Sequence, residues 1–298
     1  MKPARQVVDG VLLLNKPIGI TSNAALQKAK WLLNAKKAGH TGTLDPFADG
    51  LLPLCFGEAT KFSAYLLDAD KHYRAVQQLG VTTTTGDPEG AVLSQAAVHA
   101  SCADLADVLP RFVGEIEQIP PMHSALKHQG RPLYEYARAG IEIDRPPRKV
   151  TIRSLDMLEC TPPRVVLDVQ CSAGTYIRTL AQDIGGALGC GAHLTALTRL
   201  GSGGFKLEQA HSLAELEALD PAQRQALLLP ADCLVAHLPA VLLEDADAEA
   251  LRQGRSIAHA AAEPGLMRAY TAANTFIGLV NADAGQLGPR RLVATQQA

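Results

Sequence analysis

The stretch "GHTGTLDPFADGLLPL", residues 39–54, places a carboxylate, Asp45, between Leu44 and Pro46 in a run of loop-forming residues. A carboxylate can act as a nucleophile, or as an electrostatic partner, for an electron-poor carbon. The same pattern is also typical of an ordinary turn, because Asp before Pro favours turn initiation and Gly and Thr are frequent in loops. The Asp-Pro pair alone leaves both interpretations open.

Two further side chains could serve such a site. Arg178, in "TYIRT", carries a guanidinium, which stays charged and matches a carboxylate bidentately. Tyr73, in "DKHYR", is one of the few aromatic side chains in a sequence that is only 4% aromatic. Taken singly, each has a structural alternative: Arg178 as a surface helix arginine, Tyr73 as a core or cross-strand aromatic. His40, in the same stretch as Asp45, could be a loop histidine with satisfied hydrogen bonds.

The elements that must position these residues can be read from the apolar pattern. Buried or strand-like runs are expected at 10–19, 51–57, 72–81, 149–160 and 164–172. Helices are expected at 21–34, with Thr21 or Ser22 as N-cap, and at 58–70, 101–114 and 174–189. Strands and helices do not alternate regularly, so we predict an α+β fold with a mixed, largely antiparallel central sheet and flanking helices.

Composition limits the class of protein. The 298 residues, 47% hydrophobic and 19% charged, suffice for one large domain or two. The net charge of -2 argues against a polycation but allows a local basic patch. The cysteines are dilute and include no C-x-x-C pair, so we expect reduced core thiols rather than disulfides or a zinc site. They are Cys55, Cys102, Cys160, Cys171, Cys190 and Cys233.

No motif indicates a membrane segment, a metal or a nucleotide cofactor. The apolar run near the N-terminus is too short for a signal peptide, and no run approaches the roughly 20 residues of a membrane span. "GSGGF", residues 201–205, lacks a full G-x-G-x-x-G, and no histidines form H-E-x-x-H or H-x-x-H. We therefore expect a cytoplasmic protein without metal or cofactor.

Positive charge gathers in the irregular segment 120–153. Seven basic residues face three acidic ones there, 7 − 3 = +4, against a chain total of -2. Such a segment could grip RNA, although a solvated loop is the ordinary alternative. A composition change near 230–245 and the short alternating strands that follow predict a boundary, giving residues 1–238 and a small β-rich module, 239–298. The acidic stretch "LLEDADAEALRQG" is expected to be a solvated linker helix.

Four stretches in order carry a family resemblance. They are "LLLNKPIGITS" (12–22), "KKAGHTGTLDPFADGLLPLCFGEATK" (36–61), "LLDADKHYRA" (66–75) and "CSAGTYIRTLAQDIG" (171–185), the last running into "GAHLTALTRLGSGGF". Together they resemble the TruB-type pseudouridine synthases, which isomerise uridine 55 in the TΨC loop of tRNA. The resemblance implies a pseudouridine synthase fold, an RNA-gripping insertion at about 120–150, and a C-terminal domain similar to the PUA domain.

The resemblance also assigns roles to individual residues. Asp45 matches the catalytic aspartate, Arg178 its ion-pair partner, and Tyr73 the tyrosine that stacks on the target base. His40 matches a histidine that packs against flipped-out nucleotides. Leu197 and Tyr176 are implied to support the active site. Lys16 belongs to a Lys-Pro motif that supports the catalytic loop, and it is also a candidate for contact with RNA. The residues implied to bind RNA are Lys127, Arg131, Arg148 and Lys149.

The implied chemistry agrees with the absence of cofactor motifs. Breaking the N1–C1′ bond, turning the base and joining C5 to C1′ involves no net redox change, and the base must first be extruded from the RNA. The expected partner is the TΨC stem-loop of tRNA, and we expect a monomer. Two other functions remain possible on the residues: a catalytically silent RNA-binding module, and a glycosidic hydrolase, which would need a second carboxylate such as Asp49 or Glu58.

Overall fold

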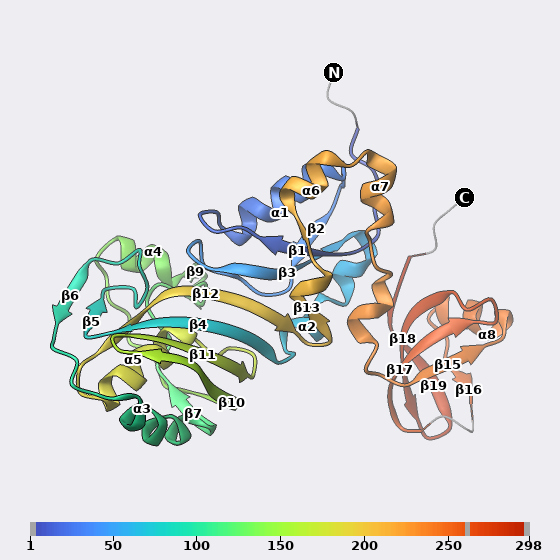
Figure 1. Ribbon diagram of the computed structural model, residues 1–298. Helices are drawn as coiled ribbons and strands as arrows, with labels where there is room; N and C mark the ends of the chain where they lie inside the picture. Colours follow the sequence, from blue (N-terminus) through green and yellow to red (C-terminus); the bar gives the residue numbers. More distant parts are fainter. Residues whose placement is uncertain (1–3, 260–262, 295–298) are drawn as a thin grey trace.

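The computed structural model describes residues 4–259 and 263–294. Two separate β-sheets, one of ten strands and one of five, form the framework of this part of the chain (Figure 1). The strands of the larger sheet are β1 (Gly10–Lys16), β2 (Ala38–His40), β3 (Asp49–Phe56), β4 (Lys71–Leu79), β7 (Gly114–Gln118), β10 (Arg148–Thr161), β11 (Arg164–Cys171), β12 (Ala192–Ser202), β13 (Phe205–Lys206) and β14 (His211–Ser212).

The larger sheet is mixed and largely antiparallel, as predicted. Its order is β14-β1-β3-β12-β4-β11-β10-β7, with β2 added beside β3 and β13 beside β12. Only the β1–β14 and β3–β12 pairs are parallel. Two short hairpins stand apart from it, formed by β5 (Val81–Thr83) with β6 (Val92–Gln95) and by β8 (Lys127–His128) with β9 (Arg131–Pro132).

The helices flank the sheet. The α-helices of residues 1–238 are α1 (Ser22–Leu32), α2 (Ser63–Leu67), α3 (Cys102–Val108), α4 (Leu133–Arg138), α5 (Ile177–Ala187), α6 (Leu213–Ala218) and α7 (Pro221–Ala226). Short 3-10 segments are η1 (Gly57–Lys61), η2 (Leu109–Phe112), η3 (Leu207–Gln209) and η4 (Ala231–Val235). The predicted helix 58–70 is therefore interrupted, because Phe62 leaves helical geometry between η1 and α2 and turns its ring into the core.

The N-terminal strand reads as a continuous apolar run because both of its faces are covered. Leu12 and Leu14 pack into the main core with the buried side of α1. Val11 and Leu13, which point the other way, join a second cluster that includes Phe62. A strand buried on both faces needs apolar residues at every position, which is what the sequence supplies.

The C-terminal sheet has the order β15-β17-β18-β19-β16. Its strands are β15 (Ala240–Leu243), β16 (Ile257–Ala258), β17 (Gly265–Thr271), β18 (Phe276–Asp283) and β19 (Gln286–Leu292), and one helix, α8 (Asp245–Arg252), accompanies them. The acidic stretch forms a helix with exposed acidic residues, as predicted, but this helix is not a linker. Ala248 and Leu251 of α8 are buried in the core of this sheet, because the helix is amphipathic and only its acidic face meets solvent.

The prediction of reduced core thiols is also wrong for one pair. Cys102, at the start of α3, and Cys160, near the end of β10, form a disulfide across a Cα–Cα distance of 5.9 Å. The helix α3 packs on β10, and this tertiary contact brings together two cysteines 58 positions apart in sequence. Cys55, Cys171, Cys190 and Cys233 are free, as expected.

The two sheets are joined through an apolar cluster. Phe62 is fully buried, and its ring centroid lies 5.4 Å from that of Phe276 in β18. Leu234 and Val235 of η4 and Leu279 of β18 belong to the same cluster. The C-terminal module therefore packs against residues that precede it rather than hanging from a free linker.

We predict that deleting residues 239–298 leaves the larger sheet folded, because its main core lies within earlier residues. The free energy of unfolding of the remaining part should fall by about 2 kcal/mol or more, since Phe62 loses its cover. Urea unfolding followed by circular dichroism measures this loss. A truncated chain that is unfolded in buffer would show that 238 is not a domain boundary.

Candidate active site

Asp45 lies in the loop between β2 and β3, and this loop is fixed to the start of α1. The backbone N–H of Leu44 donates to the hydroxyl of Ser22 at 2.7 Å, and that hydroxyl donates to the carbonyl of Leu44 at 2.9 Å. The N–H of Ala48 donates to the carbonyl of Asp45 at 3.1 Å. A turn is therefore present, as the Asp-Pro pair predicts, and it holds the carboxylate in one place.

Lys16 supports the same loop from beneath. Its side chain is fully buried, and its ammonium donates to the carbonyls of Pro17 and Ile20, each at 2.8 Å. Burial lowers the pKa of Lys16 to about 8, although the charges of Asp49 and Asp45 oppose this shift. These contacts favour the supporting role for the Lys-Pro motif, and they leave Lys16 no exposed surface with which to touch RNA.

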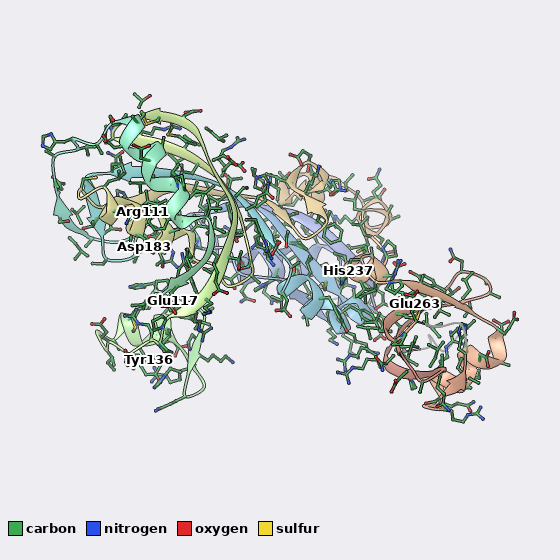
Figure 2. All side chains as sticks on the ribbon, turned by 90° about the horizontal axis from the view of Figure 1, so that it is seen from below. Arg111, Glu117, Tyr136, Asp183, His237 and Glu263 are labelled. Carbon is green, nitrogen blue, oxygen red and sulfur yellow. A yellow bond between two sulfur atoms is a disulfide. The ribbon has the colours of Figure 1, made fainter. Side chains whose placement is uncertain are left out.

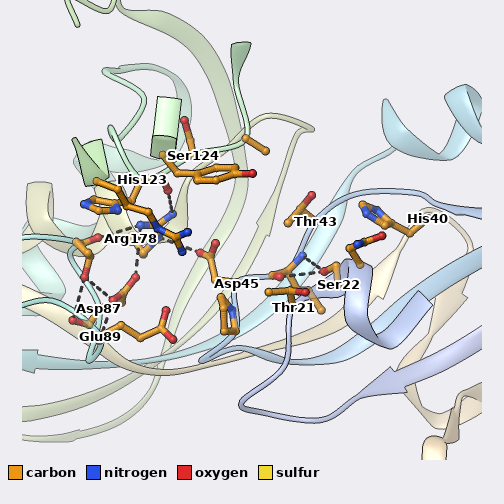
Figure 3. A pocket seen from close by; sticks show the side chains of 17 residues that line it. Thr21, Ser22, His40, Thr43, Asp45, Asp87, Glu89, His123, Ser124 and Arg178 are labelled. Carbon is orange, nitrogen blue, oxygen red and sulfur yellow. Dashed lines mark hydrogen bonds and ion pairs between the residues drawn. The ribbon is translucent and has the colours of Figure 1, made fainter. Parts of the chain in front are cut away.

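The guanidinium of Arg178, in the first turn of α5, contacts Asp45 directly. Its Nε lies 3.0 Å from Oδ2 of Asp45, and the Arg178 side chain is only 5% exposed whereas that of Asp45 is 34% exposed. The remaining nitrogens donate to the carbonyls of Thr85, at 3.0 Å, and His123, at 2.7 Å. Arg178 is thus a buried cation with several protein partners, and Asp45 is the more exposed member of the pair (Figure 3).

A second carboxylate, Asp87, shares this guanidinium. Its Oδ2 lies 3.4 Å from Nη1 of Arg178, and its side chain is 4% exposed. Burial raises the pKa of Asp45, and the charge of Asp87 adds to this rise while Arg178 opposes it. Asp87 was not among the residues singled out from the sequence, although "GDPEG", residues 86–90, holds the same Asp-Pro signal as the stretch around Asp45.

A cavity opens above the ion pair. It has a volume of about 480 Å³, and its lining includes Asp45, Arg178, Asp87, Glu89 and His123. Figure 3 shows the acidic and basic groups on one side of this cavity and the start of α1, with the loop around Thr43, on the other. An adjoining hollow of about 390 Å³ shares Asp45 and Arg178 with it.

The adjoining hollow brings together the predicted supporting residues. It is lined by Tyr73 on β4, Leu197 on β12 and Tyr176, which directly precedes α5. Burial raises the pKa of the Tyr73 and Tyr176 hydroxyls. Gln118 fixes the Tyr176 backbone by accepting from its N–H at 3.0 Å and donating to its carbonyl at 3.3 Å.

Arg199 is a further residue of this hollow that the sequence reading did not single out. It is 1% exposed, and its Nε donates to the carbonyl of Leu51 at 2.7 Å while Nη2 donates to the carbonyl of Gly42 at 3.3 Å. It therefore ties β12 to the loop that carries Asp45. Gly50 permits this approach, because it has φ +101° and a Cβ there would clash with the Arg199 backbone.

His40 lines the first cavity from β2. Burial lowers its pKa, and the charge of Arg199 lowers it further, so the ring is neutral near pH 7. Its buried Nδ1 has no hydrogen-bond partner among the residues that the structure describes. A neutral ring with an unmatched polar atom is suited to contact with a ligand in the cavity.

The basic insertion stands off the main sheet as a separate lobe, marked by Tyr136 in Figure 2. Lys127, Arg131, Arg148 and Lys149 are all exposed. Arg131 pairs with Glu135 at 3.3 Å, and Lys149 pairs with Glu115 at 2.7 Å. The insertion also contributes Tyr134 and Arg138 to the lining of the cavity, so it reaches the site itself.

In the ranges 4–259 and 263–294, no three His, Cys, Asp or Glu side chains gather where they could hold a metal ion. Within the same ranges, no helix is long and apolar enough to cross a membrane.

The chain matches three family models along its length and is similar to known tRNA pseudouridine synthases. Residues 30–177 match the model of the TruB family pseudouridylate synthase N-terminal domain, and residues 178–236 match that of the tRNA pseudouridylate synthase B C-terminal domain. Residues 239–293 match the model of the pseudouridine synthase II TruB C-terminal domain. The chain is 76% identical to tRNA pseudouridine synthase B of Thiobacillus denitrificans, over 100% of both chains. It is 56% identical to that of Chromobacterium violaceum, over 98% of this chain and 97% of the relative.

Solved structures agree with the sequence relatives. A chain of a Cbf5-Nop10-Gar1 complex is similar with a TM-score of 0.70 and 31% identity, covering 93% of this chain and 79% of that one. A chain of an H/ACA RNP bound to a substrate RNA containing 2′-deoxyuridine is similar with a TM-score of 0.72 and 26% identity, covering 97% and 86%. Because its domains match the family models and it is 76% identical to a relative over its full length, the chain belongs to the TruB family of pseudouridine synthases.

Proposed function

We propose that the protein isomerises uridine to pseudouridine at position 55 in the TΨC loop of tRNA, with Asp45 as the catalytic carboxylate. The observation that carries the proposal is the Asp45–Arg178 pair, 3.0 Å apart at the floor of a cavity wide enough for a nucleotide. The named relatives are tRNA pseudouridine synthases, which supports tRNA as the substrate. The protein works as a monomer in the cytoplasm and needs no cofactor.

The isomerisation of uridine requires one ionised carboxylate beside an extruded nucleotide. Asp45 can attack C1′ of the ribose, attack C6 of the uracil, or remove the C2′ proton, and all three routes require its charged form. Arg178 stabilises that form, since a cation about 4 Å away at an effective dielectric near 20 contributes roughly 4 kcal/mol before desolvation. Because Arg178 is buried and its guanidinium is already bonded to protein groups, it holds Asp45 rather than the substrate.

The extruded uracil occupies the adjoining hollow, with its ring against Tyr73. Base–aromatic stacking contributes roughly 1–3 kcal/mol and offsets part of the cost of unstacking the base from the RNA. Leu197 and Tyr176 close the hollow, and His40 packs against neighbouring nucleotides at the mouth. The division into residues 1–238, with the RNA-gripping insertion at 120–150, and a PUA-like RNA-binding domain, 239–298, belongs to the same proposal.

Asp45→Asn should reduce turnover below detection, because the amide keeps the shape of the side chain and removes its charge. The free energy of unfolding should not fall, since Arg178 keeps Asp87 and two carbonyls as partners. RNA affinity should also survive. Tritium release from RNA labelled at uracil C5 measures turnover, and filter binding measures affinity.

Asp49→Asn is the matched control, because it changes a carboxylate in the same stretch and should retain activity. Multiple turnover by Asp45→Asn at a hundredth of the parent rate, a barrier difference of about 2.7 kcal/mol, would exclude Asp45 as an essential nucleophile. Release of free base instead of tritiated water would indicate a hydrolase, and binding without either product would indicate a silent RNA-binding module.

The rate should depend on pH through Asp45. Its pKa is raised, so the single-turnover rate falls as pH drops through that value and the carboxylate becomes protonated. Asp87→Asn removes a negative charge that raises the Asp45 pKa, so the acid limb of the profile should move to lower pH. The maximal rate should also fall, because Arg178 loses one of its anchors. A pH–rate profile at saturating RNA checks both effects.

The control for that profile is Asp183→Asn. Burial raises the pKa of Asp183 to about 6, but the ion-pair partners of Arg178 among the described residues are Asp45 and Asp87, not Asp183. Its replacement should leave the acid limb in place. A limb that moves for Asp183→Asn and not for Asp87→Asn would contradict the assignment to Asp45.

The insertion residues should differ in their contribution to RNA binding. Lys127 and Arg148 form no ion pair with any described residue, whereas Arg131 and Lys149 are already paired. Replacing Lys127 and Arg148 with Gln should reduce the salt slope of RNA affinity by roughly 0.7–0.9 for each lost phosphate contact. Arg164→Gln, which removes an exposed arginine from the start of β11, is the control and should leave the slope unchanged. An unchanged slope for Lys127 and Arg148 would show that they do not touch phosphates.

A further inference from the structure

Residues 10–44 carry positive charge only. They include five lysines and no Asp or Glu, in a chain whose net charge is -2. Lys16 is buried beneath the catalytic loop, and the other four lie on α1 or just after it, at Lys28, Lys30, Lys36 and Lys37. The outer side of α1 is therefore a second place where positive charge gathers, distant in sequence from the insertion.

The single tryptophan of the chain lies on this outer side. Trp31 is 63% exposed, and the Lys28 ammonium sits 5.4 Å from its ring centroid. Lys28 is in turn held by Glu217 of α6 at 2.6 Å. One exposed hydrophobic residue needs no explanation by itself, so the meaning of Trp31 depends on its surroundings.

A stripe of side chains joins Trp31 to the catalytic cavity. Asn23, Gln27 and Trp31 are spaced by four residues, so they lie along one face of α1, and all three are exposed. Asn23 lines the cavity that holds Asp45, and Gln27 donates to the Asn23 side chain at 3.3 Å. The stripe covers about 12 Å along the helix axis.

Cations surround the far end of the stripe. Trp31 borders a hollow of about 460 Å³ that is also lined by Arg5 and Arg224. Arg5 donates to the carbonyl of Lys30 at 3.0 Å and Arg224 to that of Leu32 at 3.0 Å, so both arginines cap the end of α1 beside α7 (Figure 1). Among the residues that the structure describes, no carboxylate pairs with Lys30 or Lys36. An aromatic face with amides and unpaired cations is the combination that binds RNA strands.

We propose that the outer face of α1, from Asn23 to Trp31, is a second RNA-binding surface. It receives the substrate RNA where the strand leaves the catalytic cavity, with one base stacked on Trp31 and phosphates beside Lys30 and Lys36. The inference rests on the proposed RNA substrate, because the stripe begins at the cavity that the target nucleotide enters. It adds a contact on the side of the cavity opposite the insertion lobe.

The chain supplies its own probe for this surface. Since Trp31 is the only tryptophan, the indole emission of the whole protein reports this one ring. Titration with an unmodified tRNA transcript should quench the emission and reduce the acrylamide quenching constant at least twofold, in parallel with binding measured on filters. Emission and acrylamide access that stay unchanged at RNA concentrations that saturate the filter assay would overturn the proposal.

Variants of Trp31 test whether its ring stacks on an RNA base. Trp31→Ala should weaken tRNA affinity roughly 5- to 100-fold, the range expected for one lost stacking contact, and Trp31→Phe should restore most of it. Leu158→Ala, which truncates an exposed side chain on β10, is the control and should bind like the parent. Affinity unchanged by Trp31→Ala would sink the proposal even if the emission responds to RNA.

Tritium release by the parent protein distinguishes a failure of the proposed α1 surface from a failure of the proposed function. If the parent releases tritium and neither Trp31 measurement responds, the α1 surface is wrong and the proposed function stands. If the parent binds tRNA through Trp31 and releases no tritium, the surface stands and the proposed function is wrong.

Discussion

Arg178 is one guanidinium shared by two carboxylates, and the geometry of the site depends on it. Asp45 at 3.0 Å and Asp87 at 3.4 Å compete for a single positive charge, so the cluster carries an excess negative charge in a buried setting. Such an excess is costly unless the groups are hydrogen-bonded. The carbonyls of Thr85 and His123 also accept hydrogen bonds from Arg178, which helps to fix the plane of the guanidinium beside Asp45.

Four separate parts of the chain must meet for this cluster to exist. The loop after β2 carries Asp45, the loop after β5 carries Asp87, the insertion supplies the carbonyl of His123, and α5 supplies Arg178. The sheet provides the frame, because β4 pairs with both β11 and β12 and therefore sets Tyr73 and Arg199 opposite one another in register. Arg199 then bonds back to Gly42 and joins the frame to the catalytic loop.

Charge is segregated on this molecule rather than spread over it. Residues 120–153 carry +4, and residues 10–44 carry five lysines without an acid, yet the whole chain is at -2. Most of the acidic residues lie elsewhere, as in α8 on the C-terminal module. Basic surfaces on two sides of one cavity can guide a polyanion toward it, which a uniform weak charge could not do.

The sequence by itself determined the local features. The apolar runs predicted five strands of the mixed sheet, β1, β3, β4, β10 and β11. Thr21 marked the start of α1, and the motif around Asp45 with "TYIRT" indicated both members of the ion pair and the family. These succeeded because a strand, a cap or a short motif is encoded by neighbouring residues. Tertiary structure alone decided that Asp87 shares Arg178, that Arg199 reaches the catalytic loop, that Cys102 meets Cys160, and that α8 is part of a core. Each of those contacts joins residues from separate elements, and the pattern around either residue alone contains no information about its partner.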